Sequence, residues 1–273
     1  MKRFGAAPTD VFLCAWRNKS LLWQLIVREI AGRYRGSLMG LLWSFLNPTL
    51  MLLVYTFVFG VVLRARWPQS DRLTTVDFSV VIFAALIVHG LFSECITRAP
   101  GLIVGNANFV KKVVFPLELL PWTTLAAALF HALVSVFVLL TALLLLNRYI
   151  SWTAAFLPIV LVPLLLLTVG VSWFLAGLGV FVRDIGQVIG IVSTALLFMS
   201  PAFFPIEQVP KGLQLLVRLN PLTLPINQAR QVLIWGTIPD WSALASWFAI
   251  SFLICWLGFW WFQRARVGFA DVL

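Results

Sequence analysis

Long apolar runs follow one another along most of this chain, and short polar segments separate them. From Ser37 onward no formal charge appears until Arg64, a stretch longer than the ~20 residues that a helix needs to cross a bilayer. These runs do not break into alternating pieces of ~10 residues separated by turns. They therefore predict a bundle of membrane-spanning helices and not an outer-membrane β-barrel.

The pattern predicts six spans and hence an all-α integral membrane protein, with residues 37–273 as its transmembrane domain. An even number of spans places both termini on one side. If that side is the cytoplasm, 13 of the 20 Lys and Arg lie inside, so the positive-inside rule predicts cytoplasmic termini. The spans are expected near residues 37–63, 78–97, 121–146, 154–182, 185–204 and 242–262.

The first 36 residues (1–36) are expected to form a cytoplasmic arm that ends in an amphipathic helix. Ser20 can cap this helix, and Leu22, Ile26 and Ile30 recur every four residues along it. Such a helix would lie along the membrane surface. A simple membrane anchor is the alternative to a functional role.

The loop 98–120 joins the second and third predicted spans on the cytoplasmic side. One or two helical turns through residues 105–110 would present Asn106, Asn108 and Phe109 to the cytoplasm. A solvated connector is the alternative interpretation, but a connector does not require a phenylalanine at this position.

Arg183 and Asp184 are the only charged residues between the fourth and fifth predicted spans. Adjacent opposite charges at a tight turn commonly pair with each other or cap helix ends. This cytoplasmic turn is therefore either a candidate functional site or a structural turn in which the two charges pair or cap helix ends.

The outer segment 206–238 is too apolar for an ordinary loop, and it predicts a helical hairpin that dips into the outer leaflet. Asn220 followed by Pro221 is typical of the start of its second helix. The apolar stripe of that helix comprises Leu222, Ile226, Ala229 and Leu233.

The same hairpin is a candidate gate for the extracellular mouth, and a plug that stabilises the bundle is the alternative. Leu213 lies on the apolar face of its first helix and Arg218 on the opposite face. Asn227 and Arg230 lie off the apolar stripe of the second helix, where they would be available for polar contacts. The candidate gate residues are Leu213, Arg218, Asn220, Asn227 and Arg230.

Four aromatic residues within predicted spans are candidates for lining a conduit. Rings that face a conduit can stack on the apolar faces of sugars or guide a lipid tail, whereas rings that face lipid or other helices only pack. The sequence leaves both interpretations open. The four residues are Trp43, Phe57, Trp173 and Phe198.

Composition and charge support a membrane protein and argue against a nucleic-acid partner. The chain is 61% hydrophobic and 11% charged, far from the ~25% charged residues of soluble domains. Its net charge of +10 comes mainly from residues beside span ends, where they orient the protein in an anionic membrane. Three scattered cysteines predict neither a disulfide framework nor a metal site.

Catalytic and nucleotide-binding motifs are absent from the sequence. There is no GxxxxGK[ST] and no HExxH, and the two histidines fall in different spans. We therefore expect no cofactor and no enzymatic activity in this chain itself. If ATP drives the protein, another polypeptide binds it.

Four sequence motifs occur along the chain in the same order as in a known family. They are RYRGSLMGLLWSFLNP, NANFVKKVVFPLELLP, RDIGQVIGIVSTALLFMSPAFFPIEQVP and LNPLTLPINQAR. They resemble the permease subunits of ABC-2 type exporters, in the branch that exports O-antigen, teichoic acid or capsule polysaccharide. Met39 stands where this family more usually has leucine, a change that conserves volume.

The resemblance implies a homodimer of six-span permeases with two separate ABC ATPase subunits, which carry the ATP and magnesium. The complex would sit in the bacterial inner membrane and move a polysaccharide on an undecaprenyl pyrophosphate lipid. The gate helices would come from the outer hairpin. The coupling helix to the ATPase would include Asn106, Asn108, Phe109, Lys111 and Lys112.

The expected mechanism is mechanical: closure of the ATPase dimer would push the coupling and interface helices and open a path between protomers. Arg28, Arg33 and Arg35 on the interface helix would guide the pyrophosphate. Two alternatives belong to other classes. One is a membrane-embedded lipid-linked glycosyl or acyl transferase, and the other is an ATP-independent lipid flippase or channel.

Overall fold

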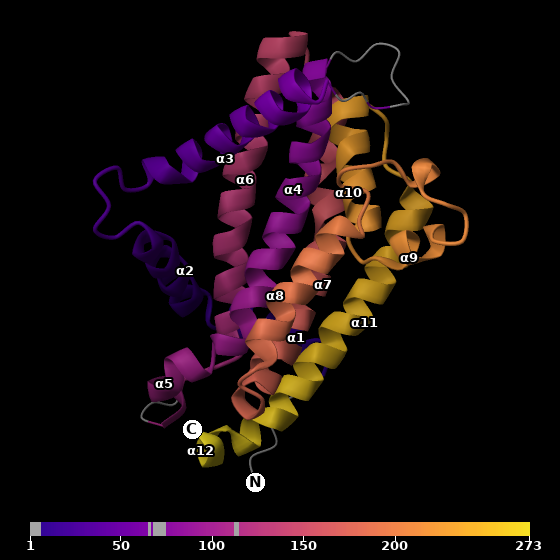
Figure 1. Cartoon of the computed structure of the whole chain (residues 1–273). Helices are drawn as coiled ribbons and strands as arrows, with labels where there is room; N and C mark the ends of the chain where they lie inside the picture. Colours follow the sequence, from indigo (N-terminus) through magenta and orange to yellow (C-terminus); the bar gives the residue numbers. More distant parts are fainter. Residues whose placement is uncertain (1–6, 65–66, 68–74, 112–114) are drawn as a thin grey trace.

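The computed structural model describes residues 7–64, 67, 75–111 and 115–273. Within these residues the secondary structure is helical, from α1 near the N-terminus to α12 at the C-terminus (Figure 1). Five helical stretches are long and apolar enough to cross a membrane. The all-α membrane class expected from the apolar runs is therefore confirmed.

The five long helices lie close to the stretches predicted from the sequence. A 14-residue helix, α8 (Ile185–Phe198), stands where the fifth of the six predicted spans was expected. At 1.5 Å per residue it is about 21 Å long, shorter than the ~30 Å hydrocarbon core, so the sixth crossing stays a prediction. The long helices are α3 (Leu42–Tyr55) with η1 (Thr56–Val62), α4 (Thr75–Arg98), α6 (Leu119–Asn147), α7 (Leu157–Phe181) and α11 (Trp241–Ala265).

The helices α4 and α7 form the middle of the bundle, and α3 leans away from it (Figure 1). In the most apolar window of α4, 61% of residues are buried, and the value for α7 is 56%. In the corresponding window of Gly40–Val62, the span that contains α3 and η1, only 6% of residues are buried. The η1 end of that span packs on α4, so the first span leaves most of its apolar surface to lipid or to another chain.

Two glycines allow α7 and α11 to cross at backbone distance. A Cβ atom built on Gly258 would lie 2.0 Å from the carbonyl oxygen of Gly170, and one on Gly170 would lie 2.5 Å from the Cα of Cys255. Small residues at such a crossing allow close van der Waals packing between helices in a membrane. This pair of helices therefore forms a tightly packed unit.

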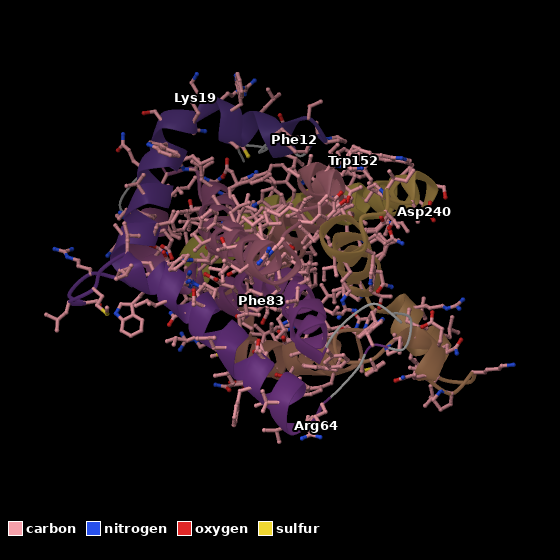
Figure 2. All side chains as sticks on the ribbon, turned by 90° about the horizontal axis from the view of Figure 1, so that it is seen from above. Phe12, Lys19, Arg64, Phe83, Trp152 and Asp240 are labelled. Carbon is pink, nitrogen blue, oxygen red and sulfur yellow. The ribbon has the colours of Figure 1, made fainter. Side chains whose placement is uncertain are left out.

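The N-terminal arm forms two helices on the rim of the bundle, α1 (Asp10–Arg17) and α2 (Lys19–Arg33). Figure 2 shows Phe12 and Lys19 at the rim, whereas Phe83 of α4 lies near the centre of the view. The predicted helix through Leu22 and Ile30 is present. However, Ser20 lies inside α2 and does not cap it, because the chain already turns at residue 18 after α1.

The outer segment contains η5 (Ile206–Gln208), α9 (Gln214–Leu219), α10 (Thr223–Arg230) and η6 (Gln231–Trp235). The apolar stripe predicted for the second helix is buried, and α10 packs against α4 and α7. In the first helix only Val217 is buried; Leu213 precedes α9 and is 52% exposed. The second helix is therefore held in the bundle, while the first is peripheral.

Candidate functional site

A cavity of about 570 Å³ lies where the end of α2 faces α3, α4 and α6. It combines hydroxyl, amide, imidazole and charged groups with an apolar wall. Sites of ~300–1,000 Å³ with a few polar groups among apolar ones are typical of small-molecule binding. Its polar and aromatic lining includes Arg33, Tyr34, Ser37, Trp43, Ser44, Asn47, Tyr55, Glu94, His131 and Ser135.

An ion-pair network at one wall of the cavity ties α2 to α4. Arg33 pairs with Glu94, and Arg98 pairs with Glu29. Arg98 also lies 3.6 Å from Glu94, one turn away on α4. These side chains are one-fifth to two-fifths exposed, so solvent screens each pair, but together they fix the end of α2 against α4.

Tyr34 and His131 form a second link across the cavity, from the end of α2 to α6. The Tyr34 hydroxyl lies 3.3 Å from Nδ1 of His131, and the two rings meet edge to face. Burial raises the pKa of Tyr34, so the phenol stays protonated at neutral pH. Among the described residues, the buried Nε2 of His131 has no hydrogen-bond partner.

The four aromatic residues proposed to line a conduit differ in their burial. Trp43 is half-buried and lines the cavity, whereas Phe57 and Phe198 are 60% and 61% exposed. Trp173 is fully buried in the core, and its indole N–H donates to the carbonyl of Glu118. The assignment of Trp173 to a conduit is therefore wrong, because its ring packs edge to face between Trp122 and Phe259.

The predicted helical turns in the cytoplasmic loop are present as η2 (Ala99–Gly101), η3 (Val104–Asn106) and α5 (Ala107–Lys111). Asn108 is exposed, whereas Asn106 is half-buried and donates to the carbonyl of Leu102. Lys111 ends α5, and Lys112 lies outside the described residues. Among Asn106, Asn108 and Phe109, Asn108 is thus the candidate coupling residue whose side chain is most open to a partner.

Phe109 does not project from the loop, because it stacks on Phe115 with ring centroids 4.3 Å apart. Arg266 in η7 (Arg266–Gly268) donates to the carbonyl of Phe115 and to the carboxylate of Glu118, at 3.0 and 2.7 Å. The last helix, α12 (Phe269–Val272), also contacts α5. The loop is therefore seated on the C-terminal end of the chain, at the lower end of Figure 1.

The remaining basic candidates lie on the surface. Arg28 and Arg35 are exposed, and no ion pair involves either of them in the part of the chain that the structure describes. Arg183 and Asp184 are exposed at the turn between α7 and α8. Asp184 precedes α8 without a side-chain capping bond, and these two side chains form no ion pair among the described residues.

Arg230 does not present its charge at the surface of the outer hairpin. Its side chain is fully buried and donates to the carbonyls of Val81, Pro201 and Ala202 at 3.0, 2.6 and 2.7 Å. The guanidinium also lies 4.7 Å from the ring of Trp67. The prediction that Arg230 lies free at the surface, available for polar contacts, is therefore wrong. The helix α10 turns this side chain inward, toward α4 and the turn after α8.

The other four gate candidates lie at different depths. Asn220 is buried, where its amide donates to the carbonyl of Leu196 and its oxygen accepts from the N–H of Leu222. Asn227 is half-buried, and Leu213 and Arg218 are exposed. Asn220 thus acts in the turn before α10. The expected helix start at Asn220 and Pro221 is wrong by two residues, because Leu222 holds the N-cap position and α10 begins at Thr223.

The sequence patterns did not single out Tyr34, Asn47 or His131 as site residues. Tyr34 and His131 are 97 positions apart, so no local spacing links them. Among the described residues, no group of three or more His, Cys, Asp or Glu could hold a metal ion. The chemistry that the cavity offers is hydrogen bonding and aromatic contact.

Known proteins resemble this chain in sequence over most of its length. Residues 20–234 match the family described as ABC-2 type transporter. The chain is 27% identical to the O-antigen export system permease protein RfbA of Myxococcus xanthus over 258 residues, which cover 94% of this chain and 96% of that protein. The protein of the same name from Klebsiella pneumoniae is 23% identical, with 94% and 97% covered. The polysialic acid transport protein KpsM of Escherichia coli is 27% identical, with 81% and 83% covered.

Proposed function

Because this chain belongs to the ABC-2 type transporter family, we propose that it is the membrane permease subunit of an ATP-driven polysaccharide exporter, with O-antigen as its substrate. The observation that carries this proposal is the match to O-antigen export permeases over nearly the whole length of both chains. Five long apolar helices supply the multi-pass membrane domain that such a subunit needs.

A separate ATPase subunit supplies the energy in this proposal. The sequence lacks GxxxxGK[ST] and contains no Gly-Lys pair, so it offers no P-loop for nucleotide phosphates. The exposed Asn108 on α5, held in place by the Phe109–Phe115 stack, is the proposed contact to the ATPase. The hydrogen bond between Arg266, which follows α11, and Glu118, which precedes α6, would transmit a displacement of α5 to both helices.

The proposal also includes the orientation of the chain, the number of its membrane crossings and its pairing with a second copy. Both termini lie in the cytoplasm, because this orientation places most of the basic residues inside. The short α8 crosses together with the buried hairpin that follows it, which gives six crossings in all. Two copies of the chain form the channel, with the sparsely buried span Gly40–Val62 among the surfaces available for pairing.

The substrate in this proposal is a polysaccharide on undecaprenyl pyrophosphate. Arg33 lines the cavity, and together with Arg28 on α2 and Arg35 just after it, it supplies the positive charge that guides the pyrophosphate. Arg28 and Arg35 are exposed, whereas Arg33 must exchange its bond to Glu94 for a phosphate oxygen. Replacing all three by glutamine should weaken binding of a prenyl pyrophosphate to the purified complex by about tenfold or more. Unchanged binding and unchanged export would contradict this role.

Co-purification tests the proposed function. When this chain is expressed with the ABC ATPase of its export system, the two should elute as one complex. The Asn108→Arg variant should weaken that association, because a larger charged side chain would occupy the proposed contact. The control is Gln208→Arg, at an exposed position of the outer segment. An ATPase that never accompanies this chain, together with normal export in cells lacking the ATPase, would favour an ATP-independent flippase or channel.

A further inference from the structure

The cavity between α2, α3, α4 and α6 has no ligand assigned to it by the family match. We propose that it is a binding site for a neutral sugar, namely the sugar next to the lipid anchor of the exported glycan. This proposal rests on the proposed export function and names the part of the substrate that the cavity holds.

The imidazole of His131 is the first argument. Tyr34 occupies the Nδ1 side of the ring at 3.3 Å, while Nε2 is buried without a hydrogen-bond partner among the described residues. A buried polar atom without a partner costs ~1–3 kcal/mol. Because the His131 side chain lines the cavity, a ligand there could supply the missing bond after a small movement of the ring. Whichever ring nitrogen carries the proton, a sugar hydroxyl suits Nε2, because a hydroxyl both donates and accepts.

The charge of the cavity is the second argument. Arg33 and Glu94 are the residues of its lining that carry formal charge, and they pair with each other. A free anion inside would meet the carboxylate of Glu94, whereas a neutral polyhydroxyl ligand would not disturb the pair. The pyrophosphate is therefore expected at the mouth, near the exposed arginines, and the sugar within.

The remaining lining residues fit both the apolar C–H face of a sugar ring and its polar hydroxyl groups. Trp43 offers an aromatic face for the C–H side of a sugar ring. Asn47 offers an amide, and the oxygens of Ser44 and Ser135, whose O–H groups donate to backbone carbonyls, retain lone pairs that accept from sugar hydroxyls. Met51, Phe83, Leu86 and Ile87 add apolar surface to the lining, which fits the first part of the prenyl chain.

Binding of two probes to the purified permease–ATPase complex in lipid nanodiscs tests the proposal. One probe is a short prenyl pyrophosphate that carries a neutral disaccharide, and the other is the same prenyl pyrophosphate without sugar. The wild-type complex should bind the sugar-bearing probe more tightly. His131→Phe and Trp43→Leu should each weaken its binding about tenfold and leave binding of the sugar-free probe unchanged.

The matched controls are Phe137→Leu and Trp152→Leu, at exposed side chains that do not line the cavity, and both should bind the two probes like wild type. ATPase association serves as the test of folding for every variant. His131→Gln, which keeps a polar nitrogen, should recover part of the affinity that His131→Phe loses.

Equal weakening of both probes would overturn the sugar assignment, since the cavity would then hold the lipid or the pyrophosphate. Unchanged binding of both probes in the cavity variants would also overturn it. In either case, continued export and ATPase association would leave the proposed function standing. The proposed function itself would fail if wild-type complex could not be assembled with the ATPase and cells exported no glycan.

Discussion

Replacing Gly258 by leucine should abolish recovery of folded protein from the membrane. Even a Cβ atom at this position would lie 2.0 Å from the carbonyl oxygen of Gly170, so α7 and α11 would have to separate. This pair makes more contacts than any other pair of elements among the described residues, and separation would leave the core around Cys255 and Phe259 unpacked. Overpacking of cores typically costs ~1–3 kcal/mol, and a collision with backbone cannot be relieved by a rotamer change.

The measurement is the yield of monodisperse protein by size-exclusion chromatography in mild detergent. Gly190→Leu on α8 is the matched control, because nothing lies within 4 Å of a Cβ atom built there. It should be recovered like wild type. Normal yield and normal thermal stability of Gly258→Leu would contradict the close crossing of α7 and α11.

Replacing Arg230 by methionine should release the outer hairpin from the bundle. The change keeps an apolar stem but removes the donors to Val81, Pro201 and Ala202. Leaving buried acceptors without partners costs ~1–3 kcal/mol each, and we expect a total loss of roughly 3 to 5 kcal/mol, as for broken buried charge networks. Lysine should not restore the stability, because a compact ammonium lacks the planar set of donors that reaches three separate carbonyls.

Thermal unfolding in detergent and hydrogen exchange of residues 214–235 measure this effect. The melting temperature should fall and exchange in the hairpin should rise, whereas the exposed Arg218→Met should change neither. A melting temperature and an exchange profile equal to those of wild type would show that Arg230 does not hold the hairpin.

The long helices could be predicted from the sequence because the length of an apolar run is a local property. The predicted ends of the spans near residues 121–146 and 154–182 lie within a few residues of α6 and α7. The stretch near 185–204 is different. Its apolar residues continue past the end of α8 at Phe198 into the turns before the hairpin, and apolarity alone does not tell a helix from buried irregular chain.

The environments of individual side chains were less predictable, because partners from distant parts of the chain decide them. Arg230 lies opposite an apolar stripe, a position that ordinarily faces solvent, yet the carbonyl of Val81, 149 residues away, accepts from it. Trp173 donates to Glu118 from the middle of an apolar helix. The Tyr34–His131 link likewise joins two helices that no periodicity connects.

The exposed first span gives the proposed mechanism its physical basis. The Arg33–Glu94 and Arg98–Glu29 pairs hold α2 to α4, while the span Gly40–Val62 has little buried surface of its own. A push on α2 would therefore act on polar contacts to α4 and leave the α7–α11 crossing intact. Such an arrangement suits a subunit that is moved by a partner.

Glycan translocation by reconstituted protein tests the central claim most directly, namely that this chain is driven by a separate ATPase. Proteoliposomes that contain the chain with its ATPase should move a lipid-linked glycan to the opposite leaflet when ATP is supplied. Transport should stop when the ATPase carries an inactivating substitution of its P-loop lysine. Equal transport by the chain alone, without ATP or ATPase, would contradict the account.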